Sequence, residues 1–206
     1  LAEKTGLIIP IGNWVINEAC RQLREWHLQG HQSWSMAVNL STLQFEQPSL
    51  VNTVLNCLAL HHVPPEMLIL EVTETTAMSN PDESVRVLTE LTEAGVKASI
   101  DDFGTGYSSL LYLKRLPACE LKIDRAFVKE LSGESEDATI VSAIVALAKT
   151  LNLKVVAEGV ETEAQQAFLT ELGCNTLQGY LLGKPVSAQT IEALCARGEM
   201  LPGAGL

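Results

Sequence analysis

The feature that most constrains this sequence is a repeated pattern, in which a short apolar run ends in a polar side chain able to bind a metal ion or a phosphate. The runs cover residues 36–38, 67–70, 98–100, 120–121, 154–157 and 175–177. The polar residues that follow them are Asn39, Glu71, Asp101 with Asp102, Lys122, Glu158 and Gln178. Helix-like stretches separate nearly all of the runs. This alternation predicts a parallel α/β barrel, whose functional side chains gather at the C-terminal ends of the strands.

Apolar spacing and helix-boundary residues predict the helices between these strands. We expect helices at 11–28, 48–60, 81–95, 137–151, 162–172 and 187–196. Asn80 is a candidate N-cap with Pro81 at the first helical position, and Leu1 to Gly6 reads as the end of a helix with a glycine stop. We assign residues 1–199 to one barrel domain and residues 200–206, which contain Pro202 and two glycines, to a flexible C-terminal tail.

Composition limits the classes of partner. The chain has 206 residues, 47% of them hydrophobic, which is enough for one substantial core. Its net charge of −11 opposes contact with nucleic-acid polymers or anionic membrane surfaces, although a small anion could bind if metal ions supplied positive charge. Five cysteines without a CxxC pair indicate a reducing compartment, so we expect a cytoplasmic location.

The polar residues at the strand ends share one kind of metal chemistry. Asn39 offers an amide oxygen, and Glu71, Asp101, Asp102 and Glu158 offer carboxylates, all of them hard ligands suited to Mg²⁺ or Mn²⁺. Neighbouring carboxylates repel each other unless a cation neutralises them. The pair Asp101-Asp102 therefore predicts a bridging position between two metal ions.

Two further features lie beside these ligands. Lys122, within the strand pattern 120–124, is either a surface lysine on an edge strand or an inward side chain that orients an attacking water. We favour the inward position. Residues 102–109 (Asp-Phe-Gly-Thr-Gly-Tyr-Ser-Ser) form a glycine-rich segment, which we expect to be a mobile cover over the site.

Together these segments resemble the EAL family of cyclic di-GMP phosphodiesterases. The resemblance rests on segments in the family's order and spacing: Asn39-Leu40-Ser41, Glu71-Val72-Thr73-Glu74, the segment 101–109, Lys122-Ile123-Asp124, Glu158-Gly159-Val160-Glu161 and Gln178-Gly179-Tyr180. It implies a modified TIM-like (β/α)₈ barrel that uses Mg²⁺ or Mn²⁺, as two ions, to open cyclic di-GMP to linear pGpG.

The resemblance also implies roles for individual residues. The implied metal ligands are Asn39, Glu71, Asp101, Asp102, Asp124 and Glu158. Lys122 resembles the family's water-orienting residue, and Gln178 resembles a group that contacts a metal or positions the substrate. Glu74 and Glu161 resemble residues that anchor the glycine-rich segment over the site.

The chain departs from the family at its start. We expect the family's Glu-Ala-Leu signature, which would supply one more metal-binding glutamate, to be absent from these residues. The family's first two strands should precede Leu1, so about six of eight strands are expected here. We expect the 206 residues alone to be inactive, or at least about 10²-fold slower than an extended domain. The resemblance further implies a homodimer, upstream sensory or diguanylate cyclase domains, and a parent protein that can be anchored to the inner membrane.

Two alternative functions stay open from the residues. A cyclic di-GMP receptor would bind the dinucleotide without hydrolysing it and pass the signal to a partner. A barrel lyase or racemase with carboxylate-bound Mg²⁺ and a lysine base would also fit Glu71, Asp101, Glu158 and Lys122. The Asp-Asp pair and the glycine-rich segment favour the phosphodiesterase.

Overall fold

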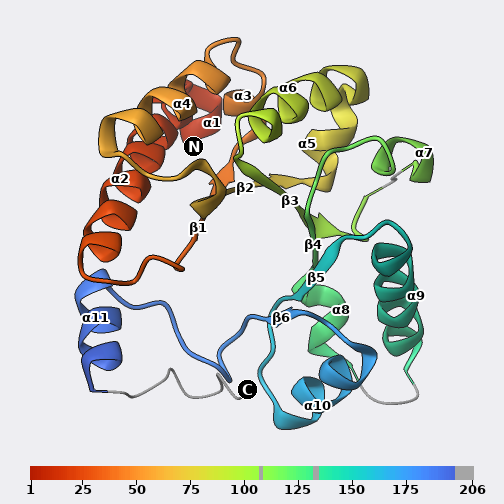
Figure 1. Cartoon of the computed structure of the whole chain (residues 1–206). Helices are drawn as coiled ribbons and strands as arrows, with labels where there is room; N and C mark the ends of the chain where they lie inside the picture. The colour runs from red at the N-terminus through yellow and green to blue at the C-terminus, as the bar shows by residue number, and fades with distance from the viewer. Residues whose placement is uncertain (107–108, 132–134, 198–206) are drawn as a thin grey trace. The chain divides into compact units, whose positions relative to one another are not determined.

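The computed structural model describes residues 1–106, 109–131 and 135–197, and the chain forms two compact units. The first unit contains Leu1–Asp101 and Gly106–Cys119, and the second contains Asp102–Thr105 and Glu120–Leu206. The boundary between them falls within strand β3 (Lys97–Phe103). Figure 1 gives the labels of the elements.

The first unit has three parallel strands in chain order. Strand β1 (Met36–Leu40) pairs with β2 (Leu68–Thr73), and β2 pairs with β3. In the register, Asn39 lies opposite Glu71, which lies opposite Ser99. Successive side chains of a strand point to opposite faces. Asn39, Glu71, Ser99 and Asp101 therefore share one face of this unit, and apolar residues such as Leu70 and Ile100 occupy the other.

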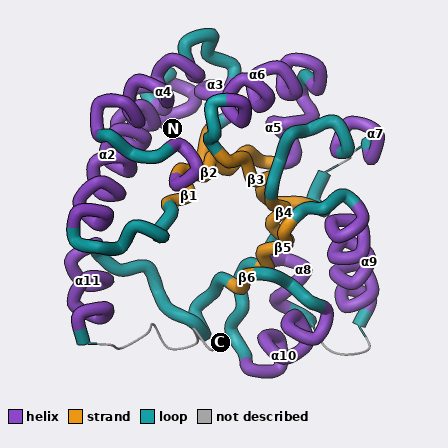
Figure 2. The backbone as a smooth tube through the Cα atoms, viewed as in Figure 1, coloured by secondary structure: helices purple, strands orange, loops and turns teal. Residues whose placement is uncertain are grey.

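Helices cover the apolar face of these strands (Figures 1 and 2). Helix α2 (Ile8–Leu28) contacts β1 and α4 (Leu50–His61), and α4 also contacts α6 (Pro81–Glu93). The core contains fully buried side chains from both layers, such as Ile16, Leu23, Leu88 and Ile100. Shorter elements complete the unit: α1 (Ala2–Thr5), α3 (Thr42–Phe45), the 3₁₀ turn η1 (Pro65–Met67), α5 (Glu74–Ser79) and α7 (Leu110–Leu113).

The second unit also has parallel strands in chain order. Strand β4 (Glu120–Ile123) pairs with β5 (Lys154–Ala157), and β5 pairs with β6 (Thr176–Leu177). Helix α9 (Glu136–Thr150) contacts both β4 and β5, and it packs against α8 (Arg125–Lys129). A capping box formed by Thr162 and Gln165 begins α10 (Glu163–Leu172), and Ser187 caps α11 (Ala188–Ala196).

The expected elements are largely confirmed, although several of their ends are shifted by one to three residues. Strands β1 to β4 extend two or three residues beyond the C-terminal ends of the expected runs, so Asn39, Glu71, Asp101 and Lys122 lie within strands rather than after them. Polar side chains do not end a strand, because the hydrogen bonds between neighbouring strands are made by backbone groups. In addition, Asn80 occupies the N-cap position of α6 but makes no side-chain capping hydrogen bond, whereas Pro81 is at the start as expected.

The α/β class with parallel strands is confirmed by both units. Among the described residues, no helix is both long enough and apolar enough to cross a membrane. The expected tail, residues 200–206, lies outside the described residues, as do residues 107–108 of the glycine-rich segment.

Candidate metal centre

The two adjacent aspartates lie near the C-terminal end of strand β3, just before its last residue, Phe103. Consecutive residues of a regular strand point to opposite faces, so Asp101 and Asp102 could not both face one site in a straight strand. Asp102 has a φ of 53°, in the left-handed region, and this turn departs from the regular pleat. Aspartate is one of the few residues other than glycine that adopts this conformation at modest cost. The local backbone thereby lets both carboxylates serve the same site.

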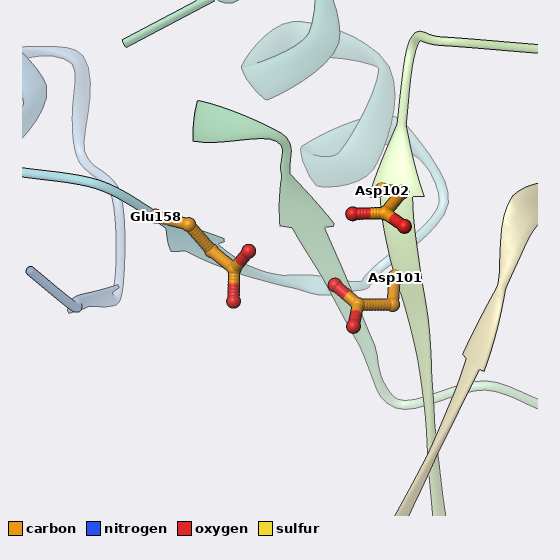
Figure 3. A group of neighbouring side chains, drawn as sticks. All are labelled: Asp101, Asp102 and Glu158. Atoms are coloured by element: carbon orange, nitrogen blue, oxygen red, sulfur yellow. The ribbon is translucent and has the colours of Figure 1, made fainter. Parts of the chain in front are cut away.

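A third carboxylate joins this pair. Asp101, Asp102 and Glu158 each offer an oxygen atom, and these oxygens lie within 4.8 Å of one another. Figure 3 shows the three carboxylate groups directed toward the same space. Glu158 directly follows β5, where its N–H donates to the Ile123 carbonyl at 3.2 Å. Three carboxylates at this separation repel one another strongly unless a cation lies among them.

Lys122 faces inward from β4, as expected. It is only 3% exposed, and its Nζ lies 2.7 Å from Oε1 of Glu158. Register explains the pairing, because Lys122 lies opposite Val156 and Glu158 follows two residues later on the same face. The surface alternative for Lys122 is therefore excluded. The ammonium group is held at the edge of the carboxylate cluster, where a donor could contact water or phosphate.

Gln178 and Asp124 lie next to Glu158 in the second unit. Gln178 follows β6, and its N–H donates to the Ala157 carbonyl at 2.8 Å while its own carbonyl accepts from Val160. Its side chain is exposed. Asp124 follows β4 and caps α8, because its Oδ1 accepts from the Ala126 N–H at 2.7 Å. A carboxylate with one oxygen on an amide keeps lone pairs for a cation.

Gly179 makes the placement of Gln178 possible. A Cβ atom at this position would lie 2.1 Å from the carbonyl oxygen and 2.2 Å from the nitrogen of Val160. Any larger side chain would force the two backbones apart and move Gln178 with them. The sequence analysis included Gly179 only as part of the segment Gln178-Gly179-Tyr180. The sequence alone does not show that the backbones of Gly179 and Val160 lie so close together.

Two expected ligands belong to the first unit. Asn39 and Glu71 lie on adjacent strands in register, so their side chains leave the sheet side by side on the same face. Glu71 is buried and Asn39 is exposed. Asp101 shares the face with Glu71, one strand further along and displaced by two residues. The unit therefore presents three candidate oxygen ligands, one amide and two carboxylates, on one surface of the sheet.

Glu74 contacts the glycine-rich segment. Its side chain is 1% exposed, and its Oε2 accepts the N–H of Gly106 at 3.4 Å. A Cβ atom at Gly106 would lie 2.9 Å from Oε1, so glycine is the residue that fits against this carboxylate. The contact agrees with the expected anchoring role of Glu74. Glu161 is exposed, and its backbone N–H donates to Oε1 of Gln165 at 2.8 Å, so its anchoring role stays a prediction.

We expect Glu74→Ala to speed amide exchange at Thr105 and Gly106 by about tenfold, because it removes a charge-assisted hydrogen bond. Hydrogen–deuterium exchange followed by mass spectrometry measures this directly. Glu90→Ala is the matched control, since Glu90 is exposed on α6 and forms an ion pair with Arg86 on the same helix. Unchanged exchange at these two amides in Glu74→Ala would contradict the anchoring role.

The expectation that the Glu-Ala-Leu tripeptide is absent from the chain is wrong. The tripeptide does occur once, as Glu192-Ala193-Leu194, but it lies inside helix α11. A helical position after the last strand does not present a glutamate at the end of a strand. The tripeptide in α11 therefore cannot replace the signature glutamate of the family.

The donor set fits hard divalent cations. Every candidate ligand in both units supplies oxygen, and the cluster of Asp101, Asp102 and Glu158 contains no thiol or imidazole. Two of the cysteines are also poor candidates for metal binding. Burial raises the pKa of Cys20 to about 12 and that of Cys174 to about 11, so both thiols stay protonated. These observations favour Mg²⁺ or Mn²⁺ over zinc.

Comparisons with known proteins agree with this geometry. The chain is 64% identical over 196 residues to the bifunctional diguanylate cyclase/cyclic di-GMP phosphodiesterase MucR of Pseudomonas aeruginosa, a match that covers 95% of this chain and 29% of MucR. It is 46% identical to the cyclic di-GMP phosphodiesterase NbdA of the same organism, over 93% of this chain and 24% of NbdA. The chain thus spans less than a third of the length of these relatives.

Solved structures of similar proteins share this fold. The structure of the P. aeruginosa MucR phosphodiesterase in complex with c-di-GMP is similar with a TM-score of 0.91 and 65% identity, over 93% of this chain and 77% of that one. The EAL domain of Mycobacterium smegmatis DcpA is similar with a TM-score of 0.85 and 39% identity, over 91% and 84% of the two chains. The profile of the EAL domain matches residues 1–185, and this chain therefore belongs to the EAL domain family.

Proposed function

We propose that this chain is the catalytic part of a metal-dependent phosphodiesterase that hydrolyses cyclic di-GMP to linear pGpG in bacterial second-messenger signalling. The observation that carries the proposal is the cluster of Asp101, Asp102 and Glu158, with Lys122 paired to Glu158 at 2.7 Å. The similarity to MucR and NbdA, whose names include cyclic di-GMP phosphodiesterase, supports the choice of substrate.

The proposed ligand set contains Asn39, Glu71, Asp101, Asp102, Asp124 and Glu158, which would hold two Mg²⁺ or Mn²⁺ ions. When bound, such ions supply positive charge to a phosphate and make water a better nucleophile at neutral pH. This charge is needed because the protein carries a net charge of −11 and its substrate has two phosphates. Metal binding thus accounts for how an acidic chain recognises an anionic dinucleotide.

The chain's own residues would provide orientation. The Lys122 ammonium has three N–H donors, and its ion pair with Glu158 fixes their direction. One donor can hold a water molecule in line with the phosphorus atom, and alignment of this kind accounts for much of the rate in phosphoryl transfer. Gln178, on the segment held against Val160, would position the substrate beside Glu158.

Three further roles stay proposals. The glycine-rich segment, anchored by Glu74 and Glu161, would cover the bound dinucleotide and exclude water. The full-length protein would act as a homodimer. It would also carry upstream sensory or diguanylate cyclase domains, a proposal supported by the similarity to the bifunctional MucR, of which this chain matches 29%. Its catalytic part would work in the cytoplasm, whether or not the protein is anchored to the inner membrane.

The test is a product analysis with the full-length protein that carries this chain. We expect cyclic di-GMP to be converted to pGpG in the presence of Mn²⁺, followed by chromatography, and the reaction to stop when the metal is chelated. Binding of the dinucleotide in Mn²⁺ without any product would instead favour a receptor. Turnover of a carboxylic acid, with the dinucleotide ignored, would favour the lyase or racemase.

A further inference from the structure

Ser99, in the middle of β3, is a buried polar residue that the proposed mechanism does not use. It is 0% exposed, and its Oγ has no hydrogen-bond partner among the described residues. A buried hydroxyl without a partner destabilises a protein, whereas alanine would fill the same position without that cost. The only other described side-chain atom of this kind is Nε2 of Gln44, which lies against Gly12 on the helical side of the first unit.

The register places Ser99 beside the proposed metal ligands. Ser99 lies directly opposite Glu71 on the neighbouring strand, and Asp101 follows it by two residues on the same face. Neighbouring strands are about 4.8 Å apart, and same-face residues of one strand are about 6.6 Å apart. The Cα of Ser99 therefore lies closer to that of Glu71 than to that of Asp101, and the Ser99 and Glu71 side chains leave neighbouring strands on the same face.

A carboxylate that binds a metal commonly uses one oxygen for the cation and offers the other to a hydrogen-bond donor. On the basis of the proposed function, we propose that Ser99 is a positioning residue. Its hydroxyl donates to the Glu71 carboxylate and fixes the orientation of that carboxylate when the metal is bound. The hydroxyl is the buried donor of this face that needs an acceptor, and Glu71 is the acceptor opposite it. This pairing explains why a fully buried position of β3 carries serine.

The test measures metal binding directly, without substrate. In the full-length protein, Ser99→Ala should weaken the affinity for Mn²⁺, measured by calorimetry, by about tenfold or more, as expected when a supporting hydrogen bond to a ligand is lost. The melting temperature in a chelator should stay the same or rise, because the buried hydroxyl is removed. Ser99→Thr keeps the hydroxyl and suits a strand, so it should restore most of the affinity.

Ser142→Ala is the matched control, since the Ser142 hydroxyl donates to the Ala138 carbonyl within α9 and lies on no strand. It should leave Mn²⁺ affinity unchanged. Equal Mn²⁺ affinity in Ser99→Ala and the unmodified protein would overturn the role of Ser99 alone. An equal loss in Ser99→Ala and Ser99→Thr would also overturn it, by showing that packing rather than the hydroxyl matters. No Mn²⁺ binding by the unmodified protein would overturn both this inference and the proposed function.

Discussion

Replacing Asp101 with asparagine in the full-length protein should lower the turnover of cyclic di-GMP by at least about 10³-fold, equivalent to about 4 kcal/mol of transition-state stabilisation. Asp101 is buried, and it is one of the three carboxylates that lie within 4.8 Å of one another. Asparagine keeps the size and one oxygen ligand but removes the negative charge that attracts the cations. Steady-state assays at saturating Mn²⁺ measure the effect.

The same variant should be at least as stable as the unmodified protein when metal is chelated, because it relieves repulsion among the carboxylates. The stabilisation that added Mn²⁺ gives to the unmodified protein should be lost. Asp82→Asn is the matched control, since Asp82 is exposed on α6 and pairs with Arg115 at 2.9 Å. Near-normal turnover by Asp101→Asn would remove Asp101 from the ligand set.

Replacing Lys122 with alanine should lower turnover by about 10²-fold or more while leaving Mn²⁺ affinity largely intact, as expected for the loss of a group that orients water. Turnover and Mn²⁺ affinity should respond differently, because the Lys122 side chain is itself a cation and does not bind a metal ion. Its removal leaves the Glu158 carboxylate more available to a metal ion. Turnover and calorimetric metal affinity, measured on the same preparation, test both parts.

Alanine at position 122 also breaks a largely buried ion pair, which can cost about 3 kcal/mol of stability. Lys122→Met fills the same volume with an apolar side chain, so it should lose the turnover with less loss of stability. Lys154→Ala, at the exposed start of β5, serves as the matched control. A collapse of Mn²⁺ affinity in Lys122→Met would show that the lysine supports the carboxylates instead of orienting water.

Much of the fold could be predicted from the sequence, because the strands and long helices are indicated by patterns among residues close together in the chain. Apolar runs ended by polar residues located all six strands, and helix-boundary residues such as Pro81 and Gly173 located the long helices. Short helices such as α5 and α8 were not predicted. They span only six and five residues, too few for a periodic pattern to be detected.

The candidate site was predicted in its residue types but not in its geometry. The sequence indicated that Lys122 faces the carboxylates, because alternation along a strand is a local property. It could not indicate the left-handed turn at Asp102, which depends on the backbone that surrounds it. Nor could it show that the Ser99 hydroxyl is buried opposite Glu71, or that Gly179 lies against Val160, since both depend on which strands become neighbours.

The left-handed backbone at Asp102 also restricts how this chain can evolve. Only glycine, asparagine and aspartate adopt that conformation readily, and other side chains would add strain of about 1 kcal/mol or more. A descendant that gave up hydrolysis but kept its fold would therefore retain Asp, Asn or Gly at position 102. Asparagine is one nucleotide change away from aspartate, and it removes the charge while preserving the turn. Drift from an enzyme toward a receptor would most easily pass through that substitution.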